Sequence, residues 1–222
     1  MEQKKFTNIQ KEILVGKMLG DSWMETTTGV GWRLRIEQSI NFRNYVEHVK
    51  EIFKDWLTEK TINSPLYVHK NHGRGDDCVT FNTITHVAFR FYGQQIHTID
   101  KESKKLIRKV SPIIHRLLTP RAIAYWYMDD GSIKSQHHKA VRFNTQRYTE
   151  KDVDLLISVL RNKFQIESRR LKTRQIETSG YSYETLSELI FPYLLPEFHY
   201  KFPEPRKSDW IEKENLTKLH KE

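Results

Sequence analysis

The chain has 222 residues and a formal net charge of +9, from 37 Lys and Arg against 28 Asp and Glu. Hydrophobic residues make up 37% and charged residues 29%, a composition that excludes a disordered basic tail and predicts a folded core. The single cysteine, Cys78, excludes an internal disulfide and argues against a thiolate zinc site.

The surplus of positive charge favours a polyanionic partner such as nucleic acid, although many basic proteins bind none. The sequence has no apolar run long enough to cross a membrane, and its N-terminus lacks the apolar segment of a secretory signal. We therefore expect an intracellular protein without a membrane partner.

Two stretches predict buried helices that end on carboxylates. In 7–21, Thr7 followed by Gln10 is a capping-box pattern, and the apolar run that follows ends at Asp21. In 118–131 (LTPRAIAYWYMDDG), Thr119 and a proline start a helix that ends at Asp129-Asp130-Gly131. A carboxylate at the negative end of a helix dipole is unfavourable alone, so we expect cations nearby.

The elements between and after these helices follow the same order twice. In the first half, 23–28 and 32–38 predict a hairpin, 44–57 an amphipathic helix, 66–70 and 79–83 a second strand pair, and 85–95 a helix. In the second half, 140–145 predicts a strand, 149–164 a helix, 167–172 and 174–178 a strand pair, and 183–195 a closing helix. The charged stretch 97–109 is interpreted as the linker.

This order predicts an α+β molecule of two αββαββα units related by a pseudo-twofold axis. The units are 1–96 and 113–203, joined by a linker at 97–112 and followed by a charged tail at 204–222 that either frays or forms a peripheral helix around Trp210. In the strand 32–38, Leu34 and Ile36 share one face, and Arg33, Arg35 and Glu37 share the other. Each sheet should therefore have a core face and a basic face.

Small residues should let the two acidic-ended helices pack side by side. Gly16 and Gly20 are four residues apart in the first helix, and Ala122 and Ala124 lie in the second. Parallel packing would bring Asp21 and Asp130 together, where Mg²⁺ could hold both carboxylates ionised and assist phosphodiester hydrolysis. Each acidic end alone is more simply a helix stop, and the repetition is what favours a metal site.

The runs 14–22 (LVGKMLGDS) and 123–131 (IAYWYMDDG) resemble the two signature helices of single-chain, intron-encoded LAGLIDADG homing endonucleases. The resemblance extends through FNTQRYTEKDVDLLISVLRNKF and PYLLPEFHYKFP and covers roughly residues 9–203. The first copy departs from the family pattern at Lys17, in an otherwise apolar stretch, and at Ser22, where the family usually has glycine. The resemblance implies two antiparallel sheets that form a saddle over DNA, with the signature helices at the interface.

The resemblance also implies functional residues. The metal-binding carboxylates map to Asp21 and Asp130, with the backbone carbonyls of Gly20 and Asp129 as further ligands. The residues that orient the attacking water map to Glu37 and Asn144, whose difference predicts unequal cleavage rates on the two strands. The basic residues near the scissile phosphates map to Lys109 and Lys201, for which a solvated surface role is the alternative.

DNA contacts are expected from basic residues on the exposed strand faces and adjoining loops, which fit the major groove as β-ribbons. The candidates are Arg33, Arg35, Lys70, Arg74, Arg142, Arg169, Lys172 and Arg174. Together they predict double-stranded DNA binding that weakens steeply with salt. The pairs His137-His138 and His69-x-x-His72 lie in polar stretches and are interpreted as solvated rather than zinc-binding.

The implied function is a monomeric, sequence-specific endonuclease that makes a Mg²⁺-dependent staggered double-strand break at a long site and so spreads its intron. We expect Mn²⁺ to substitute for Mg²⁺, and Ca²⁺ to bind without supporting cleavage. An organellar intron would place the protein in a mitochondrion or chloroplast. The alternatives are an RNA maturase that binds its host intron RNA and a non-catalytic DNA-binding regulator of the same fold.

Overall fold

The computed structural model describes residues 4–70, 76–100, 102–103, 105–135 and 138–202. Its two four-stranded antiparallel sheets have the same strand order. The first comprises β1 (Trp23–Glu25), β2 (Arg33–Ser39), β4 (Asp77–Asn82) and β3 (Tyr67–Lys70), in that order across the sheet. The second comprises β7 (Gly131–Ser135), β8 (His138–Phe143), β10 (Ile176–Thr178) and β9 (Ser168–Arg170). The repeated order agrees with the predicted duplication.

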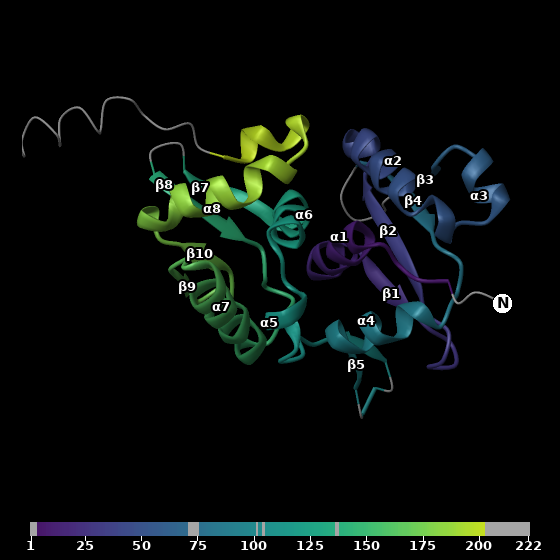
Figure 1. Cartoon of the computed structure of the whole chain (residues 1–222), viewed down its shortest axis with the longest axis horizontal. Coiled ribbons are helices and arrows are strands. Elements are labelled where there is room, and N and C mark those ends of the chain that lie inside the picture. The colour runs from purple at the N-terminus through teal and green to yellow at the C-terminus, as the bar shows by residue number, and fades with distance from the viewer. Residues whose placement is uncertain (1–3, 71–75, 101, 104, 136–137, 203–222) are drawn as a thin grey trace, which may run out of the picture.

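The helices α1 (Asn8–Leu19) and α6 (Pro120–Asp130) pack against each other between the two sheets (Figure 1). Both begin as predicted, α1 with a complete capping box at Thr7 and α6 with Thr119 as N-cap before a proline. The close approach depends on Gly16, because a Cβ there would overlap the carbonyl oxygen of Ala122. The predicted contact between small residues is therefore confirmed.

The remaining α-helices of the described chain are divided between the two units. In the first unit these are α2 (Arg43–Ile52), α3 (Glu59–Asn63) and α4 (Ala88–Ile96), and in the second α5 (Ile114–Leu117), α7 (Glu150–Phe164) and α8 (Tyr183–Ile190). The helix predicted at 183–195 ends at Ile190 and continues as a 3₁₀ turn, Phe191–Tyr193, because the proline at 192 disfavours helix in the residue before it. The helix predicted at 44–57 likewise gives way to a 3₁₀ turn, Lys54–Trp56.

The predicted linker contains a hairpin that the sequence analysis did not anticipate, formed by β5 (His97–Ile99) and β6 (Leu106–Arg108). Its apolar residues Ile99 and Ile107 are exposed, so no core-facing alternation marks the strands. Strand β7 and the short helices α3 and α5 were also missed. The prediction for the tail around Trp210 lies outside the described residues.

One hydrophobic cluster runs through both units and includes the inward faces of the sheets and nearly the whole of α6. Leu34 and Ile36 on β2 are fully buried, and so are Val141 and Phe143 in the second sheet, as the alternation predicts. No helix within the described part of the chain has the length and apolarity needed to cross a bilayer. The core thus fixes the two acidic helix ends relative to one another.

Candidate active site

The C-terminal ends of α1 and α6 bring Asp21 and Asp130 to the same cation. The Arg147 guanidinium donates through Nη2 to both carboxylate oxygens of Asp130 at 2.7 Å and to Oδ1 of Asp21 at 3.2 Å. Arg147 lies in the loop between β8 and α7. The predicted meeting of the two acidic helix ends is confirmed, and so is the expectation of a cation beside them.

Burial makes this carboxylate pair unfavourable without a cation. Asp130 is 6% exposed, and burial raises the pKa of its carboxyl to about 7 against the lowering effect of Arg147. The negative charges of Asp21 and Asp129 contribute to this raised pKa. Such a pair of oxygen donors matches the ligand preference of a hard divalent cation.

Asp129, next to Asp130, has a structural partner. Its carboxylate accepts from the ammonium of Lys17 at 2.6 Å, from the hydroxyl of Tyr45 at 3.0 Å and from the backbone N–H of Asp21 at 3.0 Å. The Lys17 and Asp129 side chains are both fully buried. The lysine that departs from the signature in the first helix is therefore neutralised by an aspartate of the second.

Because these contacts occupy the Asp129 side chain, the group of Asp129 that could bind a metal is its backbone carbonyl. Gly20 must be glycine, because a Cβ there would overlap the Asp129 carboxylate. Lys201, in the turn Pro196–Lys201, donates to the carbonyl oxygens of Met128 at 2.6 Å and Asp129 at 3.4 Å. Burial lowers the pKa of Lys201, while the neighbouring aspartates oppose that shift.

The structure places Gln38, and not the predicted Glu37, against Asp21. Gln38 donates through Nε2 to Oδ2 of Asp21 at 2.6 Å. Side chains alternate along β2, so Gln38 shares the inward side with Ile36 at the end where that side reaches the carboxylates. Glu37 points to the other face and pairs with Arg35 at 2.6 Å.

Asn144 is also away from the carboxylate to which it was assigned. Its side-chain oxygen accepts from Gln175 at 2.7 Å, while its backbone N–H donates to the carbonyl of Asp130 at 2.9 Å. The counterpart of Gln38 in the second unit is Thr145, which is fully buried and donates to the carbonyl of Arg174. The two halves of the centre are therefore unequal, with an amide at Asp21 and a guanidinium at Asp130.

Lys109 does not occupy the position in the first unit that Lys201 has in the second. It is exposed and lies beside Gln95 and Ser111, away from the described contacts of Asp21. The preceding residue, Arg108, instead donates to the carbonyl oxygens of Met18 and Ser22 at the end of α1. Alternation along β6 turns Arg108 inward and Lys109 outward.

A hollow of about 560 Å³ opens beside Asp21 and Arg147. Asp21, Gln38 and Arg147 line one part of it, and Glu37 and Cys78 of the first sheet line another. A phosphate group that entered this hollow would meet the Asp21 carboxylate and the Arg147 guanidinium together.

Comparison with known proteins assigns this arrangement to a family. The family model described as LAGLIDADG DNA endonuclease family matches residues 11–185. The chain belongs to this family. It is 27% identical to DNA endonuclease I-ChuI of Chlamydomonas applanata over 90% of this chain and 97% of that protein. It is 28% identical to the cytochrome b mRNA maturase bI2 of Saccharomyces cerevisiae over 85% of this chain and 46% of that protein.

A solved structure of the homing endonuclease I-WcaI bound to its DNA recognition sequence superposes with a TM-score of 0.75. The two proteins are 27% identical, and the alignment covers 90% of this chain and 88% of that one. The α+β fold with two antiparallel sheets is therefore the LAGLIDADG fold, as the sequence predicts. The two signature helices of the family correspond to α1 and α6.

On the outward face of the first sheet of this LAGLIDADG protein, carboxylates accompany the predicted DNA-contacting arginines. Arg33 pairs with Glu25 at 2.6 Å, and Arg35 pairs with Glu37. Lys70 on β3 is exposed. Arg74 lies outside the described residues.

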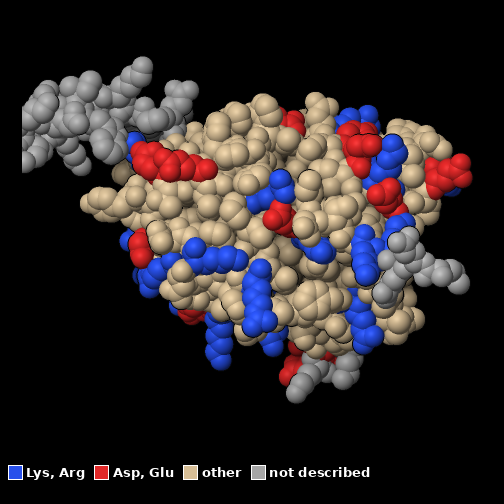
Figure 2. All heavy atoms as spheres, in the orientation of Figure 1, with Lys and Arg blue, Asp and Glu red and all other residues tan. Residues whose placement is uncertain are grey.

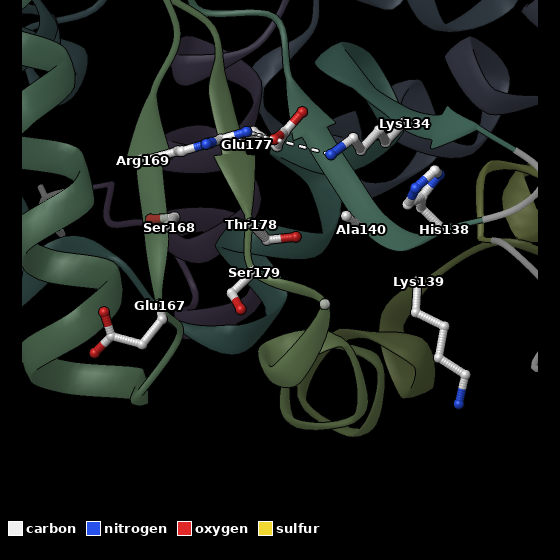
Figure 3. Close-up of a pocket in the computed structure, with 11 residues that line it drawn as sticks. Lys134, His138, Lys139, Ala140, Glu167, Ser168, Arg169, Glu177, Thr178 and Ser179 are labelled. Atoms are coloured by element: carbon white, nitrogen blue, oxygen red, sulfur yellow. Dashed lines mark hydrogen bonds and ion pairs between the residues drawn. The ribbon is translucent and has the colours of Figure 1, made fainter. Parts of the chain in front are cut away.

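In the second sheet, Glu177 holds a set of basic side chains. It accepts from Arg142 and Arg169 at 2.7 and 2.6 Å and lies 3.3 Å from the ammonium of Lys134, as Figure 3 shows for Arg169 and Lys134. Burial alone would raise the pKa of Glu177, but the three cations bring it to about 2. The arginines are thus held in fixed positions on the face predicted to meet DNA.

The other two predicted contacts of the second unit lie in the turn that joins β9 to β10. Lys172 is exposed, while Arg174 donates to the backbone carbonyl of Tyr148 at 3.0 Å. Figure 2 shows that Lys and Arg side chains also gather over the lower half of the visible face. The positive charge therefore extends beyond the strands.

Three residues at the centre were not found from the sequence. For Gln38, the alternation of Leu34 and Ile36 along β2 was an available signal, whereas the hairpin that carries Arg108 has no core-facing pattern. Arg147 lies in a loop, where no periodicity indicates the direction of a side chain. It could have been sought only through the need for a cation beside the acidic helix ends.

Proposed function

We propose that this chain is a sequence-specific DNA endonuclease that cuts both strands of a long duplex site in a Mg²⁺-dependent reaction. The staggered break would promote mobility of its intron. The observation that carries the proposal is the convergence of Asp21 and Asp130 on one guanidinium at the junction of two related units. Similarity to I-ChuI and to DNA-bound I-WcaI supports DNA as the substrate.

The residues at the centre fit a divalent cation. Asp21 and Asp130, with the carbonyls of Gly20 and Asp129, would supply oxygen ligands. Burial and the neighbouring aspartates raise the pKa of Asp130, and a divalent cation would favour its ionised form. When bound, Mg²⁺ would activate water and stabilise the leaving oxygen. Mn²⁺ should replace it, whereas Ca²⁺ should bind without supporting cleavage.

The chain's own residues would divide the remaining work. The Gln38 amide would orient a water beside Asp21, the role first assigned to Glu37. Lys201, next to the end of α6, would place its ammonium near the phosphate that Asp130 serves. Arg147 would release the carboxylates when cations bind and would then be free to contact a phosphate oxygen.

The outward faces of the two sheets of a single chain would bind the DNA. The arginines held by Glu25, Glu37 and Glu177 would contact bases or phosphates, and the exposed Lys70 and Lys172 would contact phosphates. This division predicts that Lys-to-Ala changes weaken binding to all sequences alike. Changes at Arg142 or Arg169 should instead relax selectivity at particular base pairs.

The test is selection of cleaved duplexes from a randomised library with Mg²⁺, Mn²⁺ or Ca²⁺. We expect one long site to be cut with Mg²⁺ and bound uncut with Ca²⁺. Asp21→Asn and Asp130→Asn should abolish cleavage but retain binding. Lys201→Met should slow cleavage strongly, and its matched variant Lys109→Met should not. Absence of nicking with any ion, despite tight salt-sensitive binding, would overturn the proposal in favour of a DNA-binding regulator.

The resemblance to the cytochrome b mRNA maturase favours a second candidate function, assistance in splicing of a host intron. RNA binding alone would not explain why the Asp21 and Asp130 carboxylates converge. A splicing assay on the host intron distinguishes the two functions. Splicing that survives Asp21→Asn and Asp130→Asn, with no cleavage by the unmodified protein, would identify a maturase.

A further inference from the structure

Three metal-ligating side chains from three strands of the first sheet lie together on its outward face. Donor atoms of Glu37 on β2, His69 on β3 and Cys78 on β4 all lie within 4.8 Å of one another. His69 and Cys78 are directly opposed in the β3–β4 register, and Cys78 also pairs with Ser39, two residues beyond Glu37. Strand pairing therefore assembles a cluster that is not visible as a sequence motif.

The ring of His69 has an unmet bonding requirement. Its Nδ1 is buried and has no hydrogen-bond partner among the described residues. Its Nε2 lies 3.4 Å from the Glu37 carboxylate. A buried ring nitrogen without a partner is costly, and a metal ion is one of the partners that would satisfy it.

Contrary to the expectation from a single cysteine and a solvated His69, Cys78 adds a soft donor to a cluster that includes this histidine. Cys78 is 6% exposed and forms no disulfide. A thiolate, an imidazole and a carboxylate form the ligand set that suits zinc, whereas Mg²⁺ prefers oxygen alone. The cluster therefore differs in chemical class from the Asp21–Asp130 pair.

We propose that Glu37, His69 and Cys78 form a Zn²⁺ site, separate from the carboxylate centre. Ligands of tetrahedral zinc at about 2.0–2.3 Å from the ion lie roughly 3.3–3.8 Å apart, so the three side chains need to approach one another by about 1.5 Å at most. Three protein ligands leave a fourth position for water. Glu37 and Cys78 both line the hollow of about 560 Å³, which gives the ion an entrance.

Zinc in this position would change the surface that faces DNA. Glu37 now pairs with Arg35, and ligation of the ion would withdraw that carboxylate from the guanidinium. Arg35 would then be free to bind a phosphate or a base.

The test is titration of the metal-free protein with Co²⁺ as a spectroscopic substitute for zinc. Because Cys78 is the only cysteine, a thiolate-to-cobalt charge-transfer band reports this site alone. We expect one equivalent of Co²⁺ to produce the band and one equivalent of Zn²⁺ to remove it. Cys78→Ser should abolish the band, and His69→Ala and Glu37→Gln should each weaken binding by about tenfold or more.

Controls separate this site from the carboxylate centre and from misfolding. The double variant Asp21→Asn/Asp130→Asn should retain the band, and circular dichroism should show that each ligand variant is folded. The absence of a band in the folded unmodified protein would overturn the proposal. A band that survives His69→Ala, or cobalt binding that is lost only with the two aspartates, would also overturn it.

Discussion

The buried ion pair between Lys17 and Asp129 joins the two signature helices, and its removal should show how much the interface depends on it. Asp129→Asn keeps the shape of the side chain but leaves the fully buried Lys17 ammonium without a counter-charge, facing only neutral acceptors such as the amide oxygen and the Tyr45 hydroxyl at 3.3 Å. Breaking a buried pair on one side costs about 3–5 kcal/mol in free energy of unfolding. For a chain of this length that corresponds to a drop in melting temperature of roughly 6–20 °C.

The reverse change, Lys17→Met, leaves a buried carboxylate that still accepts from Tyr45, Gln38 and the backbone N–H of Asp21. Because burial raises the pKa of Asp129, that carboxyl can take up a proton, and the cost of Lys17→Met should shrink as the pH is lowered. The double variant Lys17→Met/Asp129→Asn contains no unpaired charge. We expect it to be little worse than either single variant, with a coupling energy of about 3 kcal/mol.

Urea unfolding, followed by tryptophan fluorescence and circular dichroism, measures the four members of this double-mutant cycle: the unmodified protein, the two single variants and the double variant. Equal slopes of free energy against urea would show that the variants share one unfolded state. Single variants that lose less than about 1 kcal/mol, or losses that simply add in the double variant, would refute the reasoning from burial.

Three further predictions concern the same molecule without divalent ions. Because the pKa of Asp130 is raised to about 7, its ionisation lowers the free energy of unfolding as the pH rises from about 4 to 7. Asp130→Asn should therefore unfold at a higher urea concentration than the unmodified protein at pH 8. Calorimetry should also show that Mg²⁺ binds the unmodified protein more tightly at pH 8 than at pH 6. Burial lowers the pKa of His97 to about 3, so as the pH falls below 6.5 the unfolded chain takes up a proton before the folded protein does, and stability is lost. His97→Phe should reduce this loss of stability between pH 6.5 and 4. An unchanged dependence of unfolding free energy on pH would contradict this assignment. Gly16→Ala should lower the free energy of unfolding by about 1–3 kcal/mol because its Cβ overlaps the Ala122 carbonyl. In the control Gly180→Ala, the nearest atom to the new Cβ is 3.7 Å away, and the change should be within about 0.5 kcal/mol. Equal melting temperatures would show that α1 and α6 can move apart to accept the methyl group.

Local signals in the sequence were sufficient for the framework of the fold. The capping box at Thr7 and the proline after Thr119 start α1 and α6 where predicted, and the alternation of Leu34 and Ile36 assigns the faces of the first sheet. These signals depend only on residues a few positions apart, so a single sequence contains them. The repeated order of elements then placed the two acidic helix ends together.

Two predicted site residues lie one position away from the side chains that contact the acidic helix end. Gln38, next to Glu37, contacts Asp21, and Arg108, next to Lys109, contacts the end of α1. In a strand, a displacement of one residue moves a side chain to the opposite face, so a small error in alignment exchanges a buried contact for an exposed one. The burial pattern along each strand is therefore a better guide to the inward residue than residue type.

The remaining features depend on contacts between distant segments. Arg147 reaches Asp21 across 126 positions of sequence, and the Glu37–His69–Cys78 cluster forms only when three strands come into register. The hairpin in the linker has exposed apolar residues and so lacks a core-facing pattern. Neither propensity nor spacing in one sequence predicts such contacts.

The lysine–aspartate pair across α1 and α6 also bears on how the duplicated halves can be recombined. By position in the signature, the counterpart of Lys17 is Trp126 and the counterpart of Asp129 is Gly20. A dimer built from two first halves would bury two ammonium groups with no carboxylate, and one built from two second halves would bury two carboxylates with no lysine. The two halves therefore depend on each other for this ion pair. A symmetric dimer built from one half would have to be redesigned at the positions of Lys17 and Asp129.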